Sequence, residues 1–304
     1  MCDIWKTRDQ KKIGVREIKL QLESFRRLGV RWIVFSGGEP LMNAELPEMC
    51  SLLRAEGIRL TLLSTGLLLK KCAVDVAKNF DDVIVSLDGP REIHDGIRRV
   101  PGAFDLLREG IDALRNIRSD IKITTRCTVQ KANHGHLMET MRAAKQLRLD
   151  GISFLAVDVT STAFNRVLVW PLNRQTEIGL SLTELEVLEN EIESLIAASG
   201  RDLFETGFVA ESPQKLRRIA RHFRAQLGLA ASESPLCNAP WVSAVIEADG
   251  SVRPCFFHPS IGNLNGTTLD AVINGPEARS FRSALDVSSN PICRNCVCSL
   301  NYRT

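Results

Sequence analysis

Five of the nine cysteines lie in the last quarter of this 304-residue chain, where they form two closely spaced groups. They are Cys237, Cys255, Cys293, Cys296 and Cys298. Thiolates are soft ligands, and four that converge suit an iron-sulfur cluster or a zinc ion. We predict a metal site held by the first four of these cysteines, with Cys298 as the substitute.

The first group has the spacing C-x12-G-x4-C, and the second, CRNCVC, has the spacing C-x2-C-x-C. The segment WVSAVIEADGSVRPCFF alternates like two strands around the turn signal Asp249-Gly250, which predicts a hairpin flanked by cysteines. The terminal loop then brings the second group over the first. Zinc stays an alternative because spacing alone does not separate it from iron. His258 is a weaker candidate ligand, since five cysteines are available.

A second candidate site is the segment VFSGGEPLM, in which Gly37, Gly38, Glu39 and Pro40 follow the short apolar run RWIVFS. Paired glycines let bare backbone approach a ligand, and the carboxyl ends of strands line the active sites of barrel proteins. A backbone carbonyl and the Glu39 carboxylate can hold an ammonium group there. The alternative interpretation is a glycine-rich turn.

The elements that must position these residues alternate between helix and strand from residue 15 to about residue 157. The segment VREIKLQLESFRRLG places Ile18, Leu22 and Phe25 at helical spacing. Strand-like runs occur in RWIVFS, LRAEGIRLTLLSTG, FDDVIVSLDG, RSDIKITTRCTVQ and RLDGISFLAVD. The alternation predicts an α/β fold with a parallel sheet covered on both faces. Five strands are one short of a common partial barrel.

Two further helices are predicted beyond residue 158. The segment SLTELEVLENEIESLIAAS begins with a capping box, Ser181 with Glu184. Its predicted buried face consists of Leu185, Leu188, Ile192 and Leu195. The segment SPQKLRRIARHFRAQLG has Ser212 as its cap. Its predicted inward face consists of Leu216, Ile219, Phe223 and Leu227.

The other face of this second helix is basic. It carries Lys215, Arg217, Arg218, Arg221 and Arg224. A solvated helix face is the favoured interpretation, and a receptor for an acidic peptide is the alternative. The isolated Cys50, Cys72 and Cys127 are predicted to be core thiols.

The composition points to no charged partner. The chain has 39 basic and 36 acidic residues, a formal charge of +3, which argues against nucleic acid. It has no apolar run of membrane-spanning length and no N-terminal secretory signal, so we expect a soluble cytoplasmic protein with no membrane partner.

In combination, these motifs resemble the radical S-adenosylmethionine (SAM) superfamily. GGEP follows the second barrel strand in that family, and VSLDGPREIHDGIRRVPGAFD resembles the stretch after the fourth strand. Ser86 and Arg98 match positions that contact the bound nucleotide cofactor in relatives. The resemblance implies a partial (β/α)6 TIM-like barrel in which these two residues and the GGEP residues 37–40 bind SAM. His94 and Asp95 match family scaffold positions and are left unassigned.

The same resemblance explains CDIWK at the start of the chain. Cys2 matches the third cysteine of the family motif C-x3-C-x2-C, which holds three irons of a 4Fe-4S cluster while SAM chelates the fourth. The first barrel strand and the first two cysteines are then absent from the chain as it stands. Two explanations are open. Either the given sequence begins after the true start of the protein, or the protein has lost radical chemistry. The intact GGEP, Ser86 and Arg98 favour the first explanation.

The C-terminal cysteine pattern resembles the SPASM and twitch extensions of radical SAM enzymes. IGNL at Gly262 and Asn263 and the helix LDAVINGPEARSFR belong to the same resemblance. Full SPASM domains hold two auxiliary clusters, and the cysteines present here favour one auxiliary 4Fe-4S cluster. We expect a radical SAM barrel core over residues 1–157, a helical bridge over 158–235 and an auxiliary-cluster domain over 236–304.

For the complete protein, the resemblance implies an enzyme that reductively cleaves SAM to a 5′-deoxyadenosyl radical, which takes a hydrogen atom from the substrate. An electron donor such as flavodoxin or ferredoxin is implied. A peptide or protein is the favoured substrate, and a small molecule is the alternative. The competing interpretation is a non-catalytic or truncated barrel with a structural zinc or a single iron-sulfur site. Colour and metal content separate the two, because an iron-sulfur protein is brown and a zinc protein is colourless.

Overall fold

The computed structural model describes residues 11–302 except residues 165, 167 and 199. Its largest unit is a parallel sheet of five strands in the order β1-β2-β3-β4-β5. The strands are β1 (Trp32–Phe35), β2 (Arg59–Ser64), β3 (Asp82–Ser86), β4 (Lys122–Val129) and β5 (Gly151–Ala156). Each strand pairs with the next one along the chain because a helical crossover separates them. The predicted α/β fold is confirmed.

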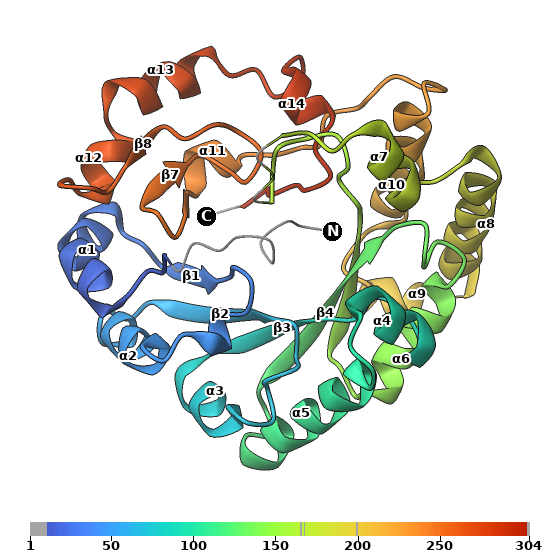
Figure 1. The fold of residues 1–304 in the computed structure, drawn as a ribbon, viewed down its shortest axis with the longest axis horizontal. Helices are drawn as coiled ribbons and strands as arrows, with labels where there is room; N and C mark the ends of the chain where they lie inside the picture. Colours follow the sequence, from blue (N-terminus) through green and yellow to red (C-terminus); the bar gives the residue numbers. More distant parts are fainter. Residues whose placement is uncertain (1–10, 165, 167, 199, 303–304) are drawn as a thin grey trace.

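Helices alternate with these strands, and Figure 1 shows α1, α2, α3, α5 and α6 along the outer side of the curved sheet. The helices are α1 (Val15–Leu28), α2 (Leu46–Ala55), α3 (Ala73–Asn79), α4 (Arg91–Arg98), α5 (Ala103–Ile117) and α6 (Leu137–Gln146). The described sheet does not close, so it forms a partial barrel. The outer face of the sheet is covered by helices, and its curvature turns the other face toward the barrel interior, as a partial barrel requires.

Burial alternates along the strands because successive side chains point to opposite faces. In β4, Ile123 and Cys127 are fully buried under the outer helices, whereas Arg126 lies on the concave side and is exposed. Cys50 is also fully buried, which confirms Cys50 and Cys127 as core thiols. Cys72 is half-buried against the core.

The C-terminal part is a small antiparallel sheet with short helices. Its strands are β6 (Val245–Ile246), β7 (Ser251–Arg253) and β8 (Gly262–Asn263). Its helices are α11 (Ala239–Val242), α12 (Leu269–Ile273), α13 (Pro276–Ala284) and α14 (Pro291–Arg294). The predicted hairpin around Gly250, which has a φ of 83°, is confirmed but shorter. Residues 239–242 form a helical turn instead of a strand, because Pro240 in its first turn suits a helix start.

This C-terminal part lies beside α1 (Figure 1). The buried Gln21 side chain donates to the Thr267 carbonyl at 3.1 Å and accepts from the Leu269 N–H at 2.7 Å. The Arg27 guanidinium holds the Asp270 carboxylate with N–O distances of 2.9 and 3.1 Å. The contacts fix the C-terminal sheet at the open side of the barrel.

The segment after β5 connects the barrel to the C-terminal part. It is organised by an ion pair between Arg166 and Asp158, whose side chains are 0% and 1% exposed. The Phe164 ring stacks on Phe256 at a centroid distance of 6.2 Å and meets Phe257 edge-on at 5.5 Å. The segment therefore links the end of β5 directly to the loop that carries Cys255.

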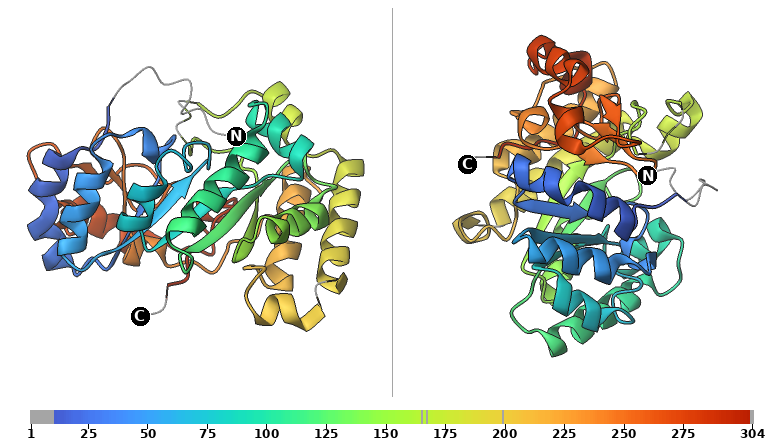
Figure 2. Two further views of the ribbon diagram at one scale, coloured as in Figure 1. Left: turned by 90° about the horizontal axis from the view of Figure 1, so that it is seen from below. Right: turned by 90° about the vertical axis from the view of Figure 1, so that its left-hand side faces the viewer.

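Four helices occupy the region between the barrel and the C-terminal part. They are α7 (Leu172–Ile178), α8 (Leu182–Ala198), α9 (Gly200–Glu205) and α10 (Pro213–Gln226). Figure 2 shows α8 to α10 grouped at the end of the sheet opposite α1. The predicted caps are confirmed, because Ser181 and Glu184 bond reciprocally and Ser212 accepts from the Lys215 N–H. The predicted burial is right except at Leu227, which lies past the end of α10 and is 38% exposed.

The basic face of α10 is mostly neutralised within the chain. Three ion pairs account for this: Arg217–Glu193, Arg224–Glu189 and Arg221–Glu233. The first two glutamates belong to α8, so these ion pairs join two helices, and Lys215 and Arg218 of the basic face take no part in them. Within the described ranges, no helix is long and apolar enough to span a membrane.

Candidate functional site

The loop after β1 carries the first candidate site. Gly37 has a φ of 138°, a backbone conformation that side chains other than glycine rarely adopt. Gly37 and Gly38 are exposed, so the backbone is open to a ligand at the carboxyl end of β1. Pro40 begins the short helix η2 (Pro40–Met42), which ends the loop. The glycine pair is thus held between a strand end and a rigid turn.

Glu39 fastens this loop to the end of β2. Its carboxylate accepts hydrogen bonds from the Thr65 N–H at 2.8 Å, the Thr65 hydroxyl at 2.5 Å and the Ser64 hydroxyl at 3.0 Å. It also accepts from the Leu41 N–H at 3.3 Å. The Glu39 side chain therefore positions the two glycines, and its contact with a ligand ammonium stays a prediction.

Replacing Glu39 with alanine is expected to weaken SAM binding by about tenfold or more, because the loop loses several charge-assisted hydrogen bonds. Equilibrium dialysis with radiolabelled SAM measures the affinity. Glu48→Gln, at an exposed carboxylate of α2 that pairs with Lys19, is the matched control and should bind SAM normally. An unchanged affinity in Glu39→Ala would show that the loop keeps its shape without the carboxylate.

Ser86 ends β3 and stands in register with Arg126 of β4, which is itself in register with Ser153 of β5. Side chains in register on neighbouring parallel strands project to the same face, so these three lie side by side on the concave face. Arg126 Nε donates to Ser153 Oγ at 3.3 Å. The structure therefore places Ser86, a predicted cofactor contact, inside the barrel next to an arginine that the sequence analysis did not single out.

Arg98, the other predicted cofactor contact, lies at the end of α4 and forms an ion pair with Asp88, with Nη2 and Oδ2 2.6 Å apart. The Asp88 side chain is only 1% exposed. The Asp88 N–H donates to His94 Nδ1 at 3.2 Å, and Asn133 Nδ2 donates to the Asp88 carbonyl at 2.8 Å. Arg98 thus stabilises the turn that follows Ser86, and its contact with the cofactor stays a prediction.

His94 and Asp95 behave as scaffold in the structure. Asp95 accepts hydrogen bonds from the N–H groups of Gly102 and Phe104 at 2.9 and 2.8 Å, which caps the start of α5. His94 is fully buried beside the Phe104 ring. Burial, and next the positive charge of Arg98, lower the pKa of His94 from 6.5 to about 4.

The protein is expected to lose stability through His94 as the pH falls from about 6.5 to about 4. In that window the unfolded chain binds the proton and the folded chain does not, so acid favours unfolding. The free energy of unfolding should fall by up to about 1.4 kcal/mol per pH unit. Urea titrations between pH 7 and pH 5 measure this slope. His94→Gln should flatten it, whereas His134→Gln, at an exposed histidine, should not. Equal slopes in both variants would contradict the assignment.

The five C-terminal cysteines converge from three segments. Cys237 precedes α11, Cys255 follows β7, and the other three lie in and after α14. Burial is the main cause that raises the pKa of Cys293 and Cys298 to about 11, and it also raises the pKa of Cys296. The charges of Cys237 and Cys255 raise all three pKa values further, which shows how close the thiols lie. Cys2, predicted for the other cluster, lies outside the described residues.

His258 lies closer to the cysteine site than its position in the sequence indicates. Its side chain is buried, and Nε2 lies 3.3 Å from the sulfur of Cys293. Burial lowers the pKa of His258. A neighbour at this distance can hydrogen-bond a metal-bound thiolate and tune it. The sequence signal was present, three residues after Cys255, but it did not show that the Cys293 loop would fold back onto it.

In the part of the chain that the structure describes, no three histidine, cysteine or acidic side chains lie close enough to hold one metal ion. A tetrahedral zinc with sulfurs at about 2.3 Å needs ligand sulfurs within about 3.8 Å of one another.

A cavity of about 160 Å³ adjoins Cys296 and Cys298. Its walls come from β4, from β5, from α10 and Glu211 two residues before it, and from the C-terminal segment 296–299. The charged and titratable lining residues are Arg126, Glu211, Lys215, Arg218 and His222. Burial raises the pKa of Glu211 to about 7, although Glu211 accepts a hydrogen bond from the Phe154 N–H at 2.8 Å. Sequence analysis missed this cavity because its walls come from distant parts of the chain.

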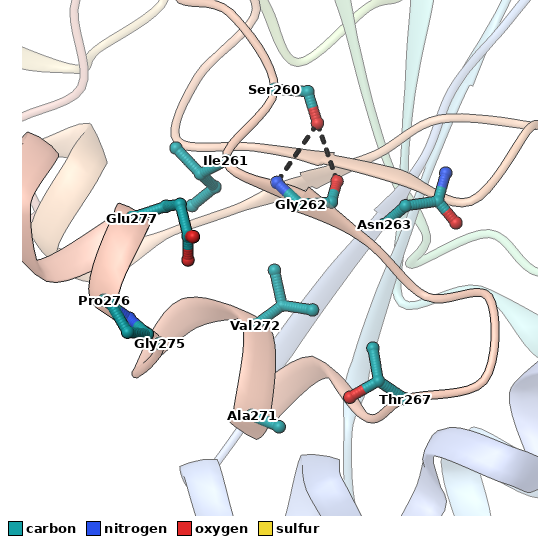
Figure 3. A pocket seen from close by; sticks show the side chains of 10 residues that line it. All are labelled: Ser260, Ile261, Gly262, Asn263, Thr267, Ala271, Val272, Gly275, Pro276 and Glu277. Atoms are coloured by element: carbon teal, nitrogen blue, oxygen red, sulfur yellow. Dashed lines mark hydrogen bonds between the residues drawn. The ribbon is translucent and has the colours of Figure 1, made fainter.

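A wider groove of about 520 Å³ lies on the surface between β8, α12 and α13 (Figure 3). Gly262, with a φ of 151°, passes so close to α12 that a Cβ on it would lie 2.7 Å from Val272. Ser260 Oγ donates to the Gly262 carbonyl and accepts from its N–H (Figure 3). The lining of this groove includes no cysteine. The groove therefore reflects the packing of the C-terminal part and is not assigned a site.

Comparison with known families agrees with the fold. Residues 1–144 match the family model of the radical SAM superfamily, and residues 237–297 match the model of the SPASM iron-sulfur cluster-binding domain. The chain therefore carries a radical SAM domain over residues 1–144 and a SPASM-type domain over residues 237–297. The two domains imply 4Fe-4S clusters and SAM as cofactors.

Similar curated proteins include enzymes of haem biosynthesis. The chain is 29% identical to an Fe-coproporphyrin III synthase of Methanosarcina barkeri, over 66% of this chain and 47% of that protein. It is 27% identical to an AdoMet-dependent heme synthase of Oleidesulfovibrio alaskensis, over 59% of this chain and 43% of that protein. The chain thus spans about half the length of these relatives. The bacteriocin subtilosin biosynthesis protein AlbA of Bacillus subtilis is 21% identical over 87% of this chain and 53% of that protein.

Solved structures with the same fold include anSMEcpe with bound AdoMet, with a TM-score of 0.65 at 18% identity over 95% of this chain and 80% of that chain. Streptococcus suis SuiB bound to S-adenosylmethionine has a TM-score of 0.62 at 14% identity over 98% of this chain and 69% of that chain. These likenesses support a partial TIM-like barrel with a C-terminal extension.

Proposed function

We propose that this chain is the SAM-cleaving part of a radical SAM oxidoreductase and that its C-terminal cysteines hold one auxiliary 4Fe-4S cluster. The observation that carries the proposal is the exposed Gly37–Gly38 backbone, which Glu39 fixes at the carboxyl end of β1. Bare backbone carbonyls held rigidly at a barrel mouth suit the amino group of SAM. The proposed organisation is a barrel core to residue 157, a helical bridge to 235 and the auxiliary-cluster domain beyond.

Each cofactor has its own residues in this proposal. The Gly37–Pro40 loop and Ser86 hold SAM, and Arg98 supports the turn beside Ser86. Cys237, Cys255, Cys293 and Cys296 hold the auxiliary cluster, with Cys298 as the substitute. Cys2 belongs to the SAM-binding cluster, whose remaining ligands precede it in the family motif.

When bound, the SAM-binding cluster supplies the electron that releases a 5′-deoxyadenosyl radical from SAM for hydrogen abstraction. The chain's own residues orient SAM and exclude water from the radical. Ser86 and Arg126 lie in register on the concave face of the sheet. A flavodoxin or ferredoxin is the proposed electron donor.

A tetrapyrrole is the substrate class that the curated relatives favour, because an Fe-coproporphyrin III synthase and two AdoMet-dependent heme synthases match at 27–30% identity. A peptide, the preference from the sequence, is the second candidate, because AlbA matches over 87% of this chain. Both candidates require the same SAM cleavage.

Anaerobic reconstitution followed by measurement of 5′-deoxyadenosine tests this function. We expect SAM cleavage with dithionite by a protein that includes all three cysteines of the C-x3-C-x2-C motif, stimulated by a tetrapyrrole more than by a precursor peptide. Stimulation by peptide alone would favour the second candidate. No cleavage by an iron-loaded protein would refute the proposal for this chain. The DNA upstream of the Met1 codon is a separate test of the cluster ligands, since an in-frame C-x3-C-x2 joining Cys2 would complete them.

A further inference from the structure

We propose that the cavity beside Cys296 and Cys298 binds a carboxylate group of the substrate, with Arg126, Lys215 and Arg218 as its cationic contacts. The inference rests on the proposed function and deepens it, because it assigns the substrate to the class of carboxylate-bearing molecules. The relevant observations are the balance of charge in the cavity, the buried donor of Arg218 and the position of Arg126.

The cavity carries an excess of positive charge. Arg126 of β4 and Lys215 of α10 form no ion pair within the described chain. By contrast, Arg217 and Arg224 of α10 are paired with glutamates. Glu211 is the one carboxylate among the lining residues, and its oxygen is already engaged by the Phe154 N–H. Apart from Cys296 and Cys298, three cations of the lining face one acid whose pKa is raised, so these side chains leave room for an added negative charge.

Arg218 contributes a donor that the chain does not satisfy. Its Nη2 donates to the Cys296 carbonyl at 2.7 Å, which ties α10 to the cysteine loop. Its Nε is buried and has no hydrogen-bond partner. An unsatisfied buried donor destabilises the chain, so a bound anion that accepts from it would be stabilised. Arginine donors match carboxylate oxygens in geometry as well as in charge.

The size and the walls favour a carboxylate on an organic arm. A volume of about 160 Å³ is roughly that of five water molecules, which is enough for a carboxylate and one or two methylene groups. The uncharged walls include Phe154, Leu155, Ile219 and Val297, which suit methylene groups.

Arg126 connects this cavity to the proposed SAM site. It lines the cavity and is in register with Ser86, one strand away on the concave face. On its other side, the positive charge of Arg126 acts on the thiol of Cys298. A substrate anchored by its carboxylate would therefore extend from the auxiliary cysteines toward the face on which SAM is proposed to bind.

Fluorine NMR of trifluoroacetate added to the iron-loaded chain tests the cavity directly. We expect saturable line broadening that acetate competes away. The double variant Arg126→Gln/Lys215→Gln should weaken binding about tenfold or more, since two charge-assisted contacts are lost. The double variant Arg217→Gln/Arg221→Gln removes the same amount of charge, at positions of α10 outside the cavity. It should bind the probe normally. Glu211→Gln, which removes the opposing charge, should bind more tightly.

Three results would overturn the inference: no saturable broadening, equal weakening in the two double variants, or displacement by inorganic phosphate at lower concentration than by acetate. Formation of 5′-deoxyadenosine by the unaltered chain is measured separately. Cleavage without probe binding would refute the cavity and keep the proposed function. Probe binding without cleavage would refute the proposed function, and the substrate assignment that rests on it, while leaving an anion site.

Discussion

Replacing Arg166 with alanine is expected to lower the free energy of unfolding by about 3–5 kcal/mol, because it leaves the buried Asp158 carboxylate without its cation. The pair is fully enclosed, with side chains 0% and 1% exposed and a distance of 2.6 Å between Nη1 and Oδ2. Arg166 Nη2 also donates to the Asp158 carbonyl at 2.6 Å. The guanidinium lies 3.9 Å from the centroid of Trp170, so the variant also loses a cation–π contact.

Urea denaturation followed by tryptophan fluorescence measures this loss. Arg174→Ala is the matched control, because Arg174 also lies over Trp170, at 5.3 Å, but pairs with a largely exposed glutamate. It should cost less than about 1 kcal/mol. The double variant Asp158→Asn/Arg166→Met should recover part of the loss, since no charge is left buried. A cost for Arg166→Ala no larger than that for Arg174→Ala would refute the structural role given to the pair.

Replacing Cys255 with alanine is expected to remove the auxiliary cluster, and with it about four irons and the matching sulfide per chain. Cys237 and Cys255 raise the pKa of every thiol in the second group through their charges, so the two groups of cysteines lie near each other. Iron and sulfide assays with electron paramagnetic resonance after reduction measure the loss.

Cys72→Ala, at a half-buried thiol on the barrel, is the control and should keep all iron. Cys298→Ala should keep the cluster if Cys237, Cys255, Cys293 and Cys296 are the ligands. Loss of the cluster in this variant would make Cys298 a ligand instead. Zinc in place of iron in the purified, anaerobically prepared protein would contradict the cluster. His258→Gln should change the spectrum or midpoint potential of the cluster more than its iron content, since His258 contacts Cys293 from outside the predicted ligand set.

Local patterns in the sequence predict much of this fold. Helical spacing in residues 15–28, apolar runs such as RWIVFS and the caps at Ser181 and Ser212 depend on neighbours within a few positions. The hairpin at Asp249-Gly250 has the same basis, since Gly250 alone supplies the positive φ of the turn. Errors fall at the ends of elements, where Leu227 and residues 241–242 follow the packing of the ends and not the periodicity.

The candidate sites also combine features that the local sequence indicates with features that only the fold shows. GGEP and the cysteine groups are contiguous in sequence, so residue types and spacing indicate their chemistry. The side-chain role of Glu39 is different, because its partners Ser64 and Thr65 lie on the next strand. Arg98 likewise matches a cofactor contact in sequence, but the buried Asp88 that engages it becomes visible only in the fold.

The sequence by itself determined the class of fold, the order of the elements and the five-thiol constellation, because each follows from local periodicity or close spacing. Only the tertiary structure decided which charges are buried and which face a ligand. The basic residues of α10 read alike in sequence, yet three pair with glutamates and the other two line the cavity with Arg126. The physical reason is that desolvation and pairing depend on groups that lie far apart along the chain, so they are set when the elements pack.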